Sequence, residues 1–195
     1  MSRPVKPGSR SLSAGDWIDA AMEAIVAGGV ASVAVEPLAV QLGTTKGSFY
    51  HHFPNRDALI IATLEEWERS QTEAVIERVE LIQDPGERLR AVLAAAFADR
   101  PGGLRDAALF ASATHPLVKP TVRRVTDRRL RYFTERYVQL GFSRPRARRR
   151  AVMLYQSYLG LFNTIRLGLA DLSDAELAAH AREVLSTLVP TTVQE

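Results

Sequence analysis

The chain has 195 residues, 46 % of them apolar, and a formal net charge of +3. It can bury one substantial core or the cores of two small domains. The absence of cysteine excludes disulfides, thiolate metal sites and a thiol nucleophile. No stretch reaches the ~18 uninterrupted apolar residues of a membrane helix, and no apolar segment of a secretory signal follows the basic first residues. We therefore expect a soluble, cytoplasmic protein with no membrane partner.

The spacing of apolar residues predicts helices along almost the whole chain and no convincing strand. Ser13 and Asp16 form a capping motif for the first helix, Asn55 caps the fourth, and Ser173 with Glu176 caps the last. The sequence Pro101-Gly102-Gly103 predicts a break, which would serve as a flexible gate or as a plain loop. The fold class is therefore all-α with about nine helices, expected near residues 14–28, 36–42, 45–52, 56–82, 85–99, 104–114, 120–140, 144–169 and 174–190.

Two of these helices are short and are joined by a tight turn at residues 43–45. These lengths are typical of a helix-turn-helix motif. The second short helix of that motif lies in the DNA major groove. Its residue types fit this role, because an ordinary helix hairpin explains neither the Lys-Gly pair nor the ring cluster in "GTTKGSFYHHF". His52 is the exception, since we expect it to pack or cap. The core beneath would hold Leu38, Ala39, Leu42, Phe49 and Phe53.

From Trp17 to about Ile60 the sequence resembles the TetR family of bacterial transcription repressors. The resemblance rests on a turn that ends in Gly, a small residue and Thr, followed by Lys-Gly, an aromatic residue, Tyr and His-Phe. It implies a homodimer that binds a palindromic double-stranded DNA operator. The residues that fall where family members contact DNA are Thr44, Thr45, Lys46, Gly47, Ser48, Tyr50 and His51, with Arg56 near the phosphate backbone.

The sequence departs from the family pattern at the second helix. Ala34 stands where the family has a Ser or Thr cap. The missing cap lowers the stability of the helix by roughly 1 kcal/mol. Glu36 would repel a phosphate, and residues 1–60 carry no net charge. We therefore expect modest or salt-sensitive DNA affinity. Residues 1–12 form either a basic arm that reaches the duplex or, as we favour, a disordered tail, and residues 191–195 are also expected to be disordered.

An arginine-rich block covers residues 123–150, which hold 11 Arg and 2 acidic residues. The apolar positions of residues 118–140 follow a buried stripe, whereas Arg123, Arg124, Arg128 and Arg131 project elsewhere. A solvated helix face is the default interpretation. Pairing with the acidic helix at residues 65–80 would absorb some of the charge. The alternative is an acidic ligand that enters between the helices and is clamped by one or two arginines.

The resemblance assigns residues 13–54 to DNA binding and residues 55–190 to ligand binding and dimerisation. A ligand pocket should be mainly apolar. Its predicted lining is aromatic: Trp67, Phe97, Phe110, Tyr132, Phe133, Tyr155, Tyr158 and Phe162. The last two helices would pair with their symmetry mates, with Gly160 allowing close approach. The predicted dimer interface comprises Leu161, Ile165, Leu177, Ala181, Val184 and Leu188.

The function that these features favour is a homodimeric, ligand-responsive repressor that an unknown small, mainly apolar effector releases from DNA. The alternative is a helical ligand-binding or activator protein of the same fold with weak or lost DNA affinity. An enzyme is not expected, because the sequence has no nucleophile elbow, no Glu-x-x-His pair and no Gly-rich phosphate loop. We expect no cofactor and no metal, and interpret Glu176, His180 and Glu183 as a solvated face.

Overall fold

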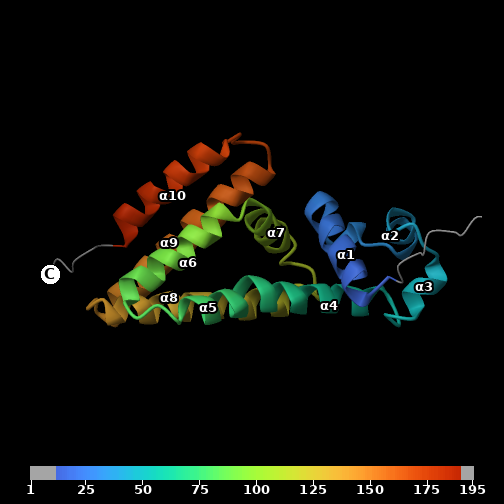
Figure 1. Ribbon diagram of the computed structural model, residues 1–195, viewed down its shortest axis with the longest axis horizontal. Helices are drawn as coiled ribbons and strands as arrows, with labels where there is room; N and C mark the ends of the chain where they lie inside the picture. The colour runs from blue at the N-terminus through green and yellow to red at the C-terminus, as the bar shows by residue number, and fades with distance from the viewer. Residues whose placement is uncertain (1–11, 190–195) are drawn as a thin grey trace, which may run out of the picture.

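A computed structural model describes residues 12–189 of the chain; most of the predicted arm (1–12) and the predicted tail (191–195) lie outside this range. Apart from a 3-10 turn and a π-helical turn, all regular structure in this range is α-helical (Figure 1). The helices are α1 (Ala14–Gly28), α2 (Val35–Gln41), α3 (Lys46–Tyr50), α4 (Arg56–Glu68), α5 (Ala74–Val79), α6 (Pro85–Ala98), α7 (Arg100–Ala111), α8 (Lys119–Gln139), α9 (Arg144–Arg166) and α10 (Asp174–Leu188).

A single long helix runs along most of the molecule. It consists of α4, a π-helical turn at Arg69–Glu73 and α5, which follow one another without a break. Counting this unit as one helix, residues 12–189 form nine, so the all-α prediction is confirmed. The head, which comprises α1, α2 and α3, lies at one end of the long helix, and α6, α8, α9 and α10 gather around the other end (Figure 1).

Side-chain caps start α1, α4 and α10 where the sequence predicts them. Ser13 and Ser173 each complete a capping box, and the Asn55 side chain accepts a hydrogen bond of 2.9 Å from the Ala58 N–H. These caps satisfy backbone donors that a helix start leaves free. The predicted exception is also observed, since Ala34 is the N-cap of α2 and provides no side-chain hydrogen bond.

The predicted break at Pro101-Gly102-Gly103 is wrong, because these residues form the first turn of α7. Proline is tolerated there, where its missing N–H has no intrahelical partner. Asp99 caps the helix by accepting a hydrogen bond of 2.9 Å from the Gly102 N–H. A Cβ atom on Gly103 would lie 2.4 Å from the ring of Phe162. The two glycines therefore allow helices to pack closely and do not form a gate.

The apolar core has two parts. One fills the space between α6, α8, α9 and α10. The other begins in the head with Trp17, Phe49 and Phe53, but it continues into Leu64 of α4, Leu109 of α7 and the first turns of α8. The head thus shares its core with helices on the far side of residue 54, so it is packed against the rest of the chain and is not a separate globule.

The apolar stripe of α10, predicted as part of a dimer interface, belongs to the core of its own chain. Leu177, Ala181, Val184 and Leu188 are buried there, and α10 packs against α6. Leu161 and Ile165 of α9 are partly buried against the same core. An amphipathic stripe shows that a face is covered but does not identify the partner. The four residues of α10 are therefore covered by their own chain, whereas Leu161 and Ile165 keep part of their surface exposed and remain predicted interface residues.

Candidate functional site

The head presents a helix-turn-helix built from α2, a tight turn and α3. Gly43 has a φ of 63°, a conformation that favours glycine, and it closes the turn after α2. Thr45 caps α3 by accepting a hydrogen bond of 3.3 Å from the Ser48 N–H. Phe49 is fully buried and meets Trp17 edge to face, with ring centroids 5.2 Å apart. This anchor fixes which side of α3 faces outward.

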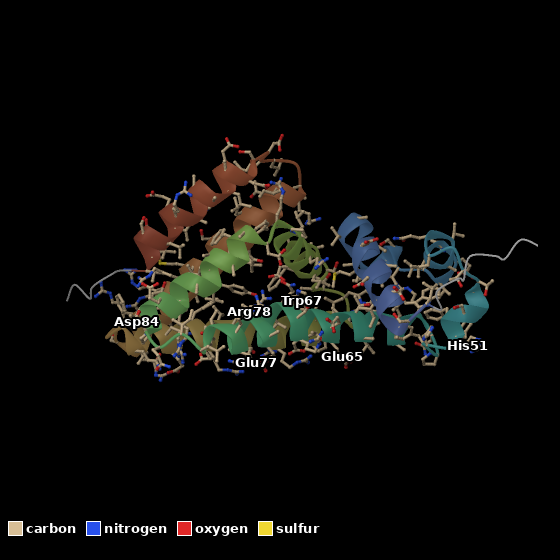
Figure 2. All side chains as sticks on the ribbon, in the orientation of Figure 1. His51, Glu65, Trp67, Glu77, Arg78 and Asp84 are labelled. Carbon is tan, nitrogen blue, oxygen red and sulfur yellow. The ribbon has the colours of Figure 1, made fainter. Side chains whose placement is uncertain are left out.

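The predicted DNA-contacting residues of the turn and α3 form one continuous surface. Tyr50 is 52 % exposed, and its ring packs edge to face on Phe49 with centroids 5.1 Å apart. Figure 2 shows His51 at the extreme end of the molecule. Thr45, Lys46, Gly47, Tyr50 and His51 are exposed, and Thr44 and Ser48 are half-buried. The structure thus brings hydroxyls, a phenol, an imidazole and an ammonium group together at the tip of the head.

Lys46 has an intramolecular partner on the same surface. Its ammonium group forms an ion pair and hydrogen bond with the carboxylate of Glu36, which lies in the first turn of α2. The hydrogen bond to Lys46 lowers the pKa of Glu36, and the hydrogen bond to Glu36 raises the pKa of Lys46. Glu36 therefore partly neutralises the single lysine that the head offers to a phosphate.

Replacing Glu36 with glutamine is expected to raise DNA affinity. The variant keeps the shape of the side chain but removes the charge that competes with phosphate for Lys46. Fluorescence anisotropy on DNA at several salt concentrations should show binding several-fold tighter and a salt slope steeper by about 0.9, the value for one phosphate contact. The matched control is Glu23→Gln, which removes the same charge from the head at a residue that bonds to Gln41. Equal gains in both variants would contradict a specific role for Glu36.

Arg56, predicted to lie near the DNA backbone, stands at the start of α4 and makes hydrogen bonds within the head. Its Nε donates a hydrogen bond of 2.5 Å to the Val33 carbonyl, and Nη2 donates one of 2.6 Å to the Val30 carbonyl. The half-buried guanidinium therefore fastens the link between α1 and α2 to the start of α4. In this structure Arg56 positions the helix-turn-helix through Nε and Nη2, while its Nη1 lies 3.5 Å from the exposed Asp57 carboxylate.

A cavity of about 220 Å³ lies between the long helix, α6, α8 and α9. Most of its wall is apolar, and polar groups enter it from the long helix, α7 and α8. Tyr132, Phe133, Tyr155 and Tyr158 line it, as predicted from the sequence. The other lining residues are Gln71, Thr72, Val75, Ile76, Arg78, Val92, Leu93, Ala95, Ala96, Asp99, Asp106, Arg129 and Leu154.

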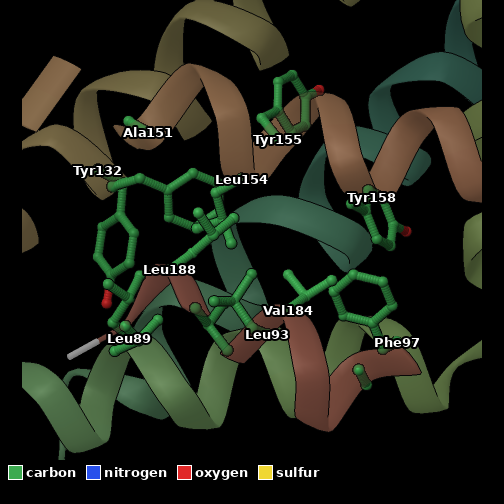
Figure 3. Packing of buried hydrophobic residues seen from close by; sticks show 14 of the residues in the cluster. Leu89, Leu93, Phe97, Tyr132, Ala151, Leu154, Tyr155, Tyr158, Val184 and Leu188 are labelled. Carbon is green, nitrogen blue, oxygen red and sulfur yellow. The ribbon is translucent and has the colours of Figure 1, made fainter. Parts of the chain in front are cut away.

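The other four predicted pocket aromatics lie behind this wall. Phe97 meets Tyr158 edge to face with ring centroids 5.6 Å apart. Figure 3 shows the two rings next to each other, Phe97 on α6 and Tyr158 on α9. Phe162 also packs on Tyr158, at 5.0 Å, and Phe110 packs on Tyr155, at 6.0 Å. Together with Trp67 these rings support the cavity wall; Trp67, Phe97 and Phe162 are buried core residues, and Phe110 is half-buried.

Sequence reasoning missed a buried ion pair in the wall between Arg129 of α8 and Asp106 of α7. The distance from Nη1 to Oδ2 is 2.5 Å, and the two residues are 7 % and 2 % exposed. Asp106 also accepts hydrogen bonds from the Trp67 indole at 2.7 Å and from the Tyr158 hydroxyl at 3.2 Å. One feature of the sequence could have indicated that Arg129 is buried: it lies four residues after Val125, on the apolar stripe of the helix.

The pKa values of this cluster show how the buried charges are held. Burial opposes the charge of Arg129, but the Asp106 carboxylate and neighbouring groups outweigh it, so its pKa lies above the ordinary value. Burial, followed by the nearby Asp106 carboxylate, raises the pKa of Tyr158 well above its ordinary value. Tyr158 is therefore a neutral phenol at physiological pH and donates its proton to the carboxylate.

Three arginines of α8, including the predicted outward residues Arg124 and Arg128, pair with acidic residues of the predicted acidic helix at residues 65–80. Arg124 Nε lies 2.8 Å from Glu68, Arg128 Nε lies 3.1 Å from Glu73, and Arg136 Nη1 lies 2.6 Å from Glu80. Exposed pairs of this kind each contribute little stability, and salt screens them. Their arrangement nevertheless holds α8 alongside the long helix over several turns (Figure 1).

The free side of α9 carries a different stripe from the one predicted. Met153 and Leu167 are 55 % and 52 % exposed, and Gly160 lies midway between them with open space around its Cα. Gln156 and Asn163 are also exposed and line a shallow groove between α7 and α9. Positions 153, 156, 160, 163 and 167 follow the alternating three- and four-residue spacing of a helix-pairing seam.

Within residues 12–189, no helix combines the length and the apolar character needed to cross a bilayer. The same residues contain no group of three or more His, Cys, Asp or Glu side chains placed to hold a metal ion. Glu176 takes part in the capping box of α10, and His180 is half-buried beside the Phe97 ring, at 6.0 Å between centroids.

Comparison with known proteins agrees with this geometry. Residues 18–63 match the family model of bacterial regulatory proteins of the tetR family. Among curated proteins, no sequence matches the chain.

Solved structures resemble the chain along most of its length. A TetR-family regulator from Agrobacterium tumefaciens has a TM-score of 0.75 at 23 % identity, covering 90 % of this chain and 97 % of its own. A transcriptional regulator from Rhodococcus sp. Rha1 has a TM-score of 0.75 at 19 % identity, covering 91 % and 96 %. The regulator FadR from Bacillus subtilis, in complex with stearoyl-CoA, has a TM-score of 0.71 at 19 % identity, covering 93 % and 100 %. Residues 18–63 thus carry the helix-turn-helix of the tetR family of bacterial regulatory proteins, and the chain shares the fold of these solved regulators along the rest of its length.

Proposed function

We propose that the chain is a homodimeric transcriptional repressor that binds a palindromic operator and is released by a small, mainly apolar effector. One observation supports DNA binding most strongly: the fully buried Phe49 fixes α3 so that Lys46 and Tyr50 point outward from the tip of the head. Hydroxyl, phenol and ammonium groups on such a surface suit phosphates and base edges. In this proposal, residues 13–54 bind DNA, and residues 55–190 bind the effector and the second subunit.

The seam on α9 supports the dimer. Gly160 has no atom within 4 Å of the position that a Cβ would take, so a second helix could approach the backbone closely there. Exposed Met153 and Leu167 would flank this contact on either side. A palindromic operator requires two reading helices, roughly 34 Å apart for adjacent half-sites, which one chain cannot supply.

The cavity beneath the long helix supports an effector site. Its wall is mainly apolar, and the same long helix carries the head at its other end. The similar FadR from Bacillus subtilis was solved with stearoyl-CoA, whose acyl chain is apolar. An effector that prefers a different spacing of the two heads would lower DNA affinity by its difference in affinity for the two arrangements.

The decisive experiment compares the wild type with the Lys46→Ala, Tyr50→Ala double variant on DNA from upstream of its own gene. Fluorescence anisotropy at several salt concentrations should show tight wild-type binding and a loss of about tenfold or more in the variant, with a shallower salt slope. The matched control, Arg131→Ala, removes an exposed positive charge from α8, outside the head. If wild type and double variant bind equally weakly even at low salt, the protein is better described as a helical ligand-binding protein that lacks DNA affinity.

A further inference from the structure

The long helix contains one irregular turn, and it lies beside the cavity. Residues Arg69–Glu73 are π-helical, and the Ala74 N–H bonds to the Arg69 carbonyl five residues earlier. A π turn holds more residues than an α turn, is rare, and occurs frequently at functional sites. Gln71 and Thr72 of this turn line the cavity. The turn therefore separates the part of the long helix that carries the head from the part that continues along the cavity.

A single buried side chain holds this turn. Arg129 donates from Nε to the Thr72 hydroxyl at 2.9 Å and from Nη2 to the Gln71 carbonyl at 3.0 Å. The other side of the guanidinium pairs with Asp106 of α7. Arg129 thus connects the π-helical turn to both α8 and α7. If Thr72 and Gln71 lost this donor, the turn would lose its buried ties to these helices and would keep the Arg128–Glu73 ion pair to α8.

The size of the cavity indicates that a bound molecule must move part of the wall. Ligand pockets usually measure about 300–1,000 Å³, whereas this cavity measures about 220 Å³. Opposite the long helix the wall includes Leu93 and Leu154, which are almost fully buried in regular helices. The backbone of the π-helical turn, in contrast, can change to the hydrogen-bonding pattern of an α-helix.

Building on the proposed function, we propose that the effector is an uncharged, mainly apolar molecule whose carbonyl-type oxygen takes Arg129 from Thr72 and Gln71 and thereby releases the π-helical turn. The released segment becomes α-helical, which shifts the two halves of the long helix against each other by one residue. One residue corresponds to about 1.5 Å of rise and about 100° of rotation. The head, at the far end of α4, moves with that shift.

The charge balance of the cavity wall is the reason for proposing an uncharged effector. Arg129 and Asp106 are the buried charges of the wall and already neutralise each other, so a carboxylate placed beside them would bury an uncompensated charge. The other two charged lining residues, exposed Arg78 and half-buried Asp99, are likewise of opposite sign. Asp106 already accepts hydrogen bonds from Trp67, Arg129 and Tyr158, which leaves little capacity for a ligand amine. A neutral carbonyl oxygen accepts from the guanidinium without adding charge.

The ligand class is tested by calorimetric titration of the full chain with three eight-carbon probes: octanamide, octanoate and octylamine. We expect octanamide to bind at least about tenfold more tightly than either charged probe, which corresponds to 1.4 kcal/mol. Equal or tighter binding of octanoate or octylamine would overturn the uncharged class. Failure of all three would count against the ligand class and against the proposed effector site together.

The release of the turn is tested without DNA and, in one arm, without ligand. Thr72→Val keeps the side-chain shape but removes the hydroxyl that accepts from Arg129. Thr63→Val is the matched control, since Thr63 is buried on α4 and bonds only to the Leu59 carbonyl of its own helix, at 2.8 Å. Hydrogen exchange should be about tenfold faster at residues 69–76 in Thr72→Val and unchanged there in Thr63→Val. Octanamide should alter exchange in the same segment of the wild type.

Unchanged exchange at residues 69–76 in Thr72→Val would overturn the role of Arg129 in holding the turn. Binding of octanamide with no change in that segment would overturn its release by the effector. In both cases DNA binding, measured separately by anisotropy, would still decide the proposed repressor function.

Discussion

Replacing Asp106 with asparagine is expected to lower the free energy of unfolding by about 3–5 kcal/mol, the usual cost of removing one partner from a buried ion pair. The variant keeps the size of the side chain but leaves the Arg129 guanidinium buried without its counter-charge. It also provides one carbonyl oxygen where the Trp67 indole and the Tyr158 hydroxyl now donate to a carboxylate. Urea unfolding should show a lower midpoint with an unchanged slope.

The matched control for this prediction is Asp127→Asn. Asp127 is exposed on α8, close to Arg129 in the sequence, and the same change of charge there should alter stability by about 0.5 kcal/mol at most. The double variant Asp106→Asn, Arg129→Gln should lose less than the sum of its two single variants, because neither charge is left alone. A loss below about 1 kcal/mol for Asp106→Asn would show that the pair is not desolvated as the structure indicates.

Replacing Gly160 with glutamate is expected to convert the proposed dimer into a monomer and to weaken operator binding by about 100-fold or more. The new side chain would enter the proposed seam on α9, where two copies would place like charges close together. A monomer binds one half-site at a time and loses the effective concentration that links the two heads, which is worth 10²–10⁴-fold. Sedimentation velocity measures the mass, and anisotropy measures the affinity.

The variant should fold as the wild type does, because the Cβ of residue 160 meets no atom within 4 Å. Leu81→Glu is the control, since Leu81 is 81 % exposed in the turn after α5 and receives the same charge away from α9. It should remain dimeric. A Gly160→Glu protein that sediments as a dimer would show that the subunits meet through another face.

The parts of the fold that depend on neighbouring residues could be predicted from the sequence. Ser13, Asn55 and Ser173 mark their helix starts because a cap bonds to backbone three residues away. The helix-turn-helix is equally local, since Gly43 sets the turn and Phe49 sets the inward face. The head could therefore be assigned in detail before the structure.

The parts that depend on distant residues could not be predicted. Gly103 indicates a chain break in the sequence, but it lies in the first turn of α7, and only the structure shows the ring of Phe162 packed against it. The stripe of α10 was clear, but its partner could have been a second chain or, as observed, α6. Arg129 was counted with the basic surface because nothing near it in the sequence shows that Asp106 meets it.

The distribution of tryptophan gives the protein two optical reporters of its own. Trp17 lies in the core of the head against Phe49, and Trp67 donates its indole N–H to Asp106 in the cavity wall. These are the chain's two tryptophans. Their emission therefore divides between the two regions that the proposed mechanism couples. With Trp17 replaced by phenylalanine, the remaining emission comes from the cavity wall alone, and its difference from the wild-type emission gives the signal of the head.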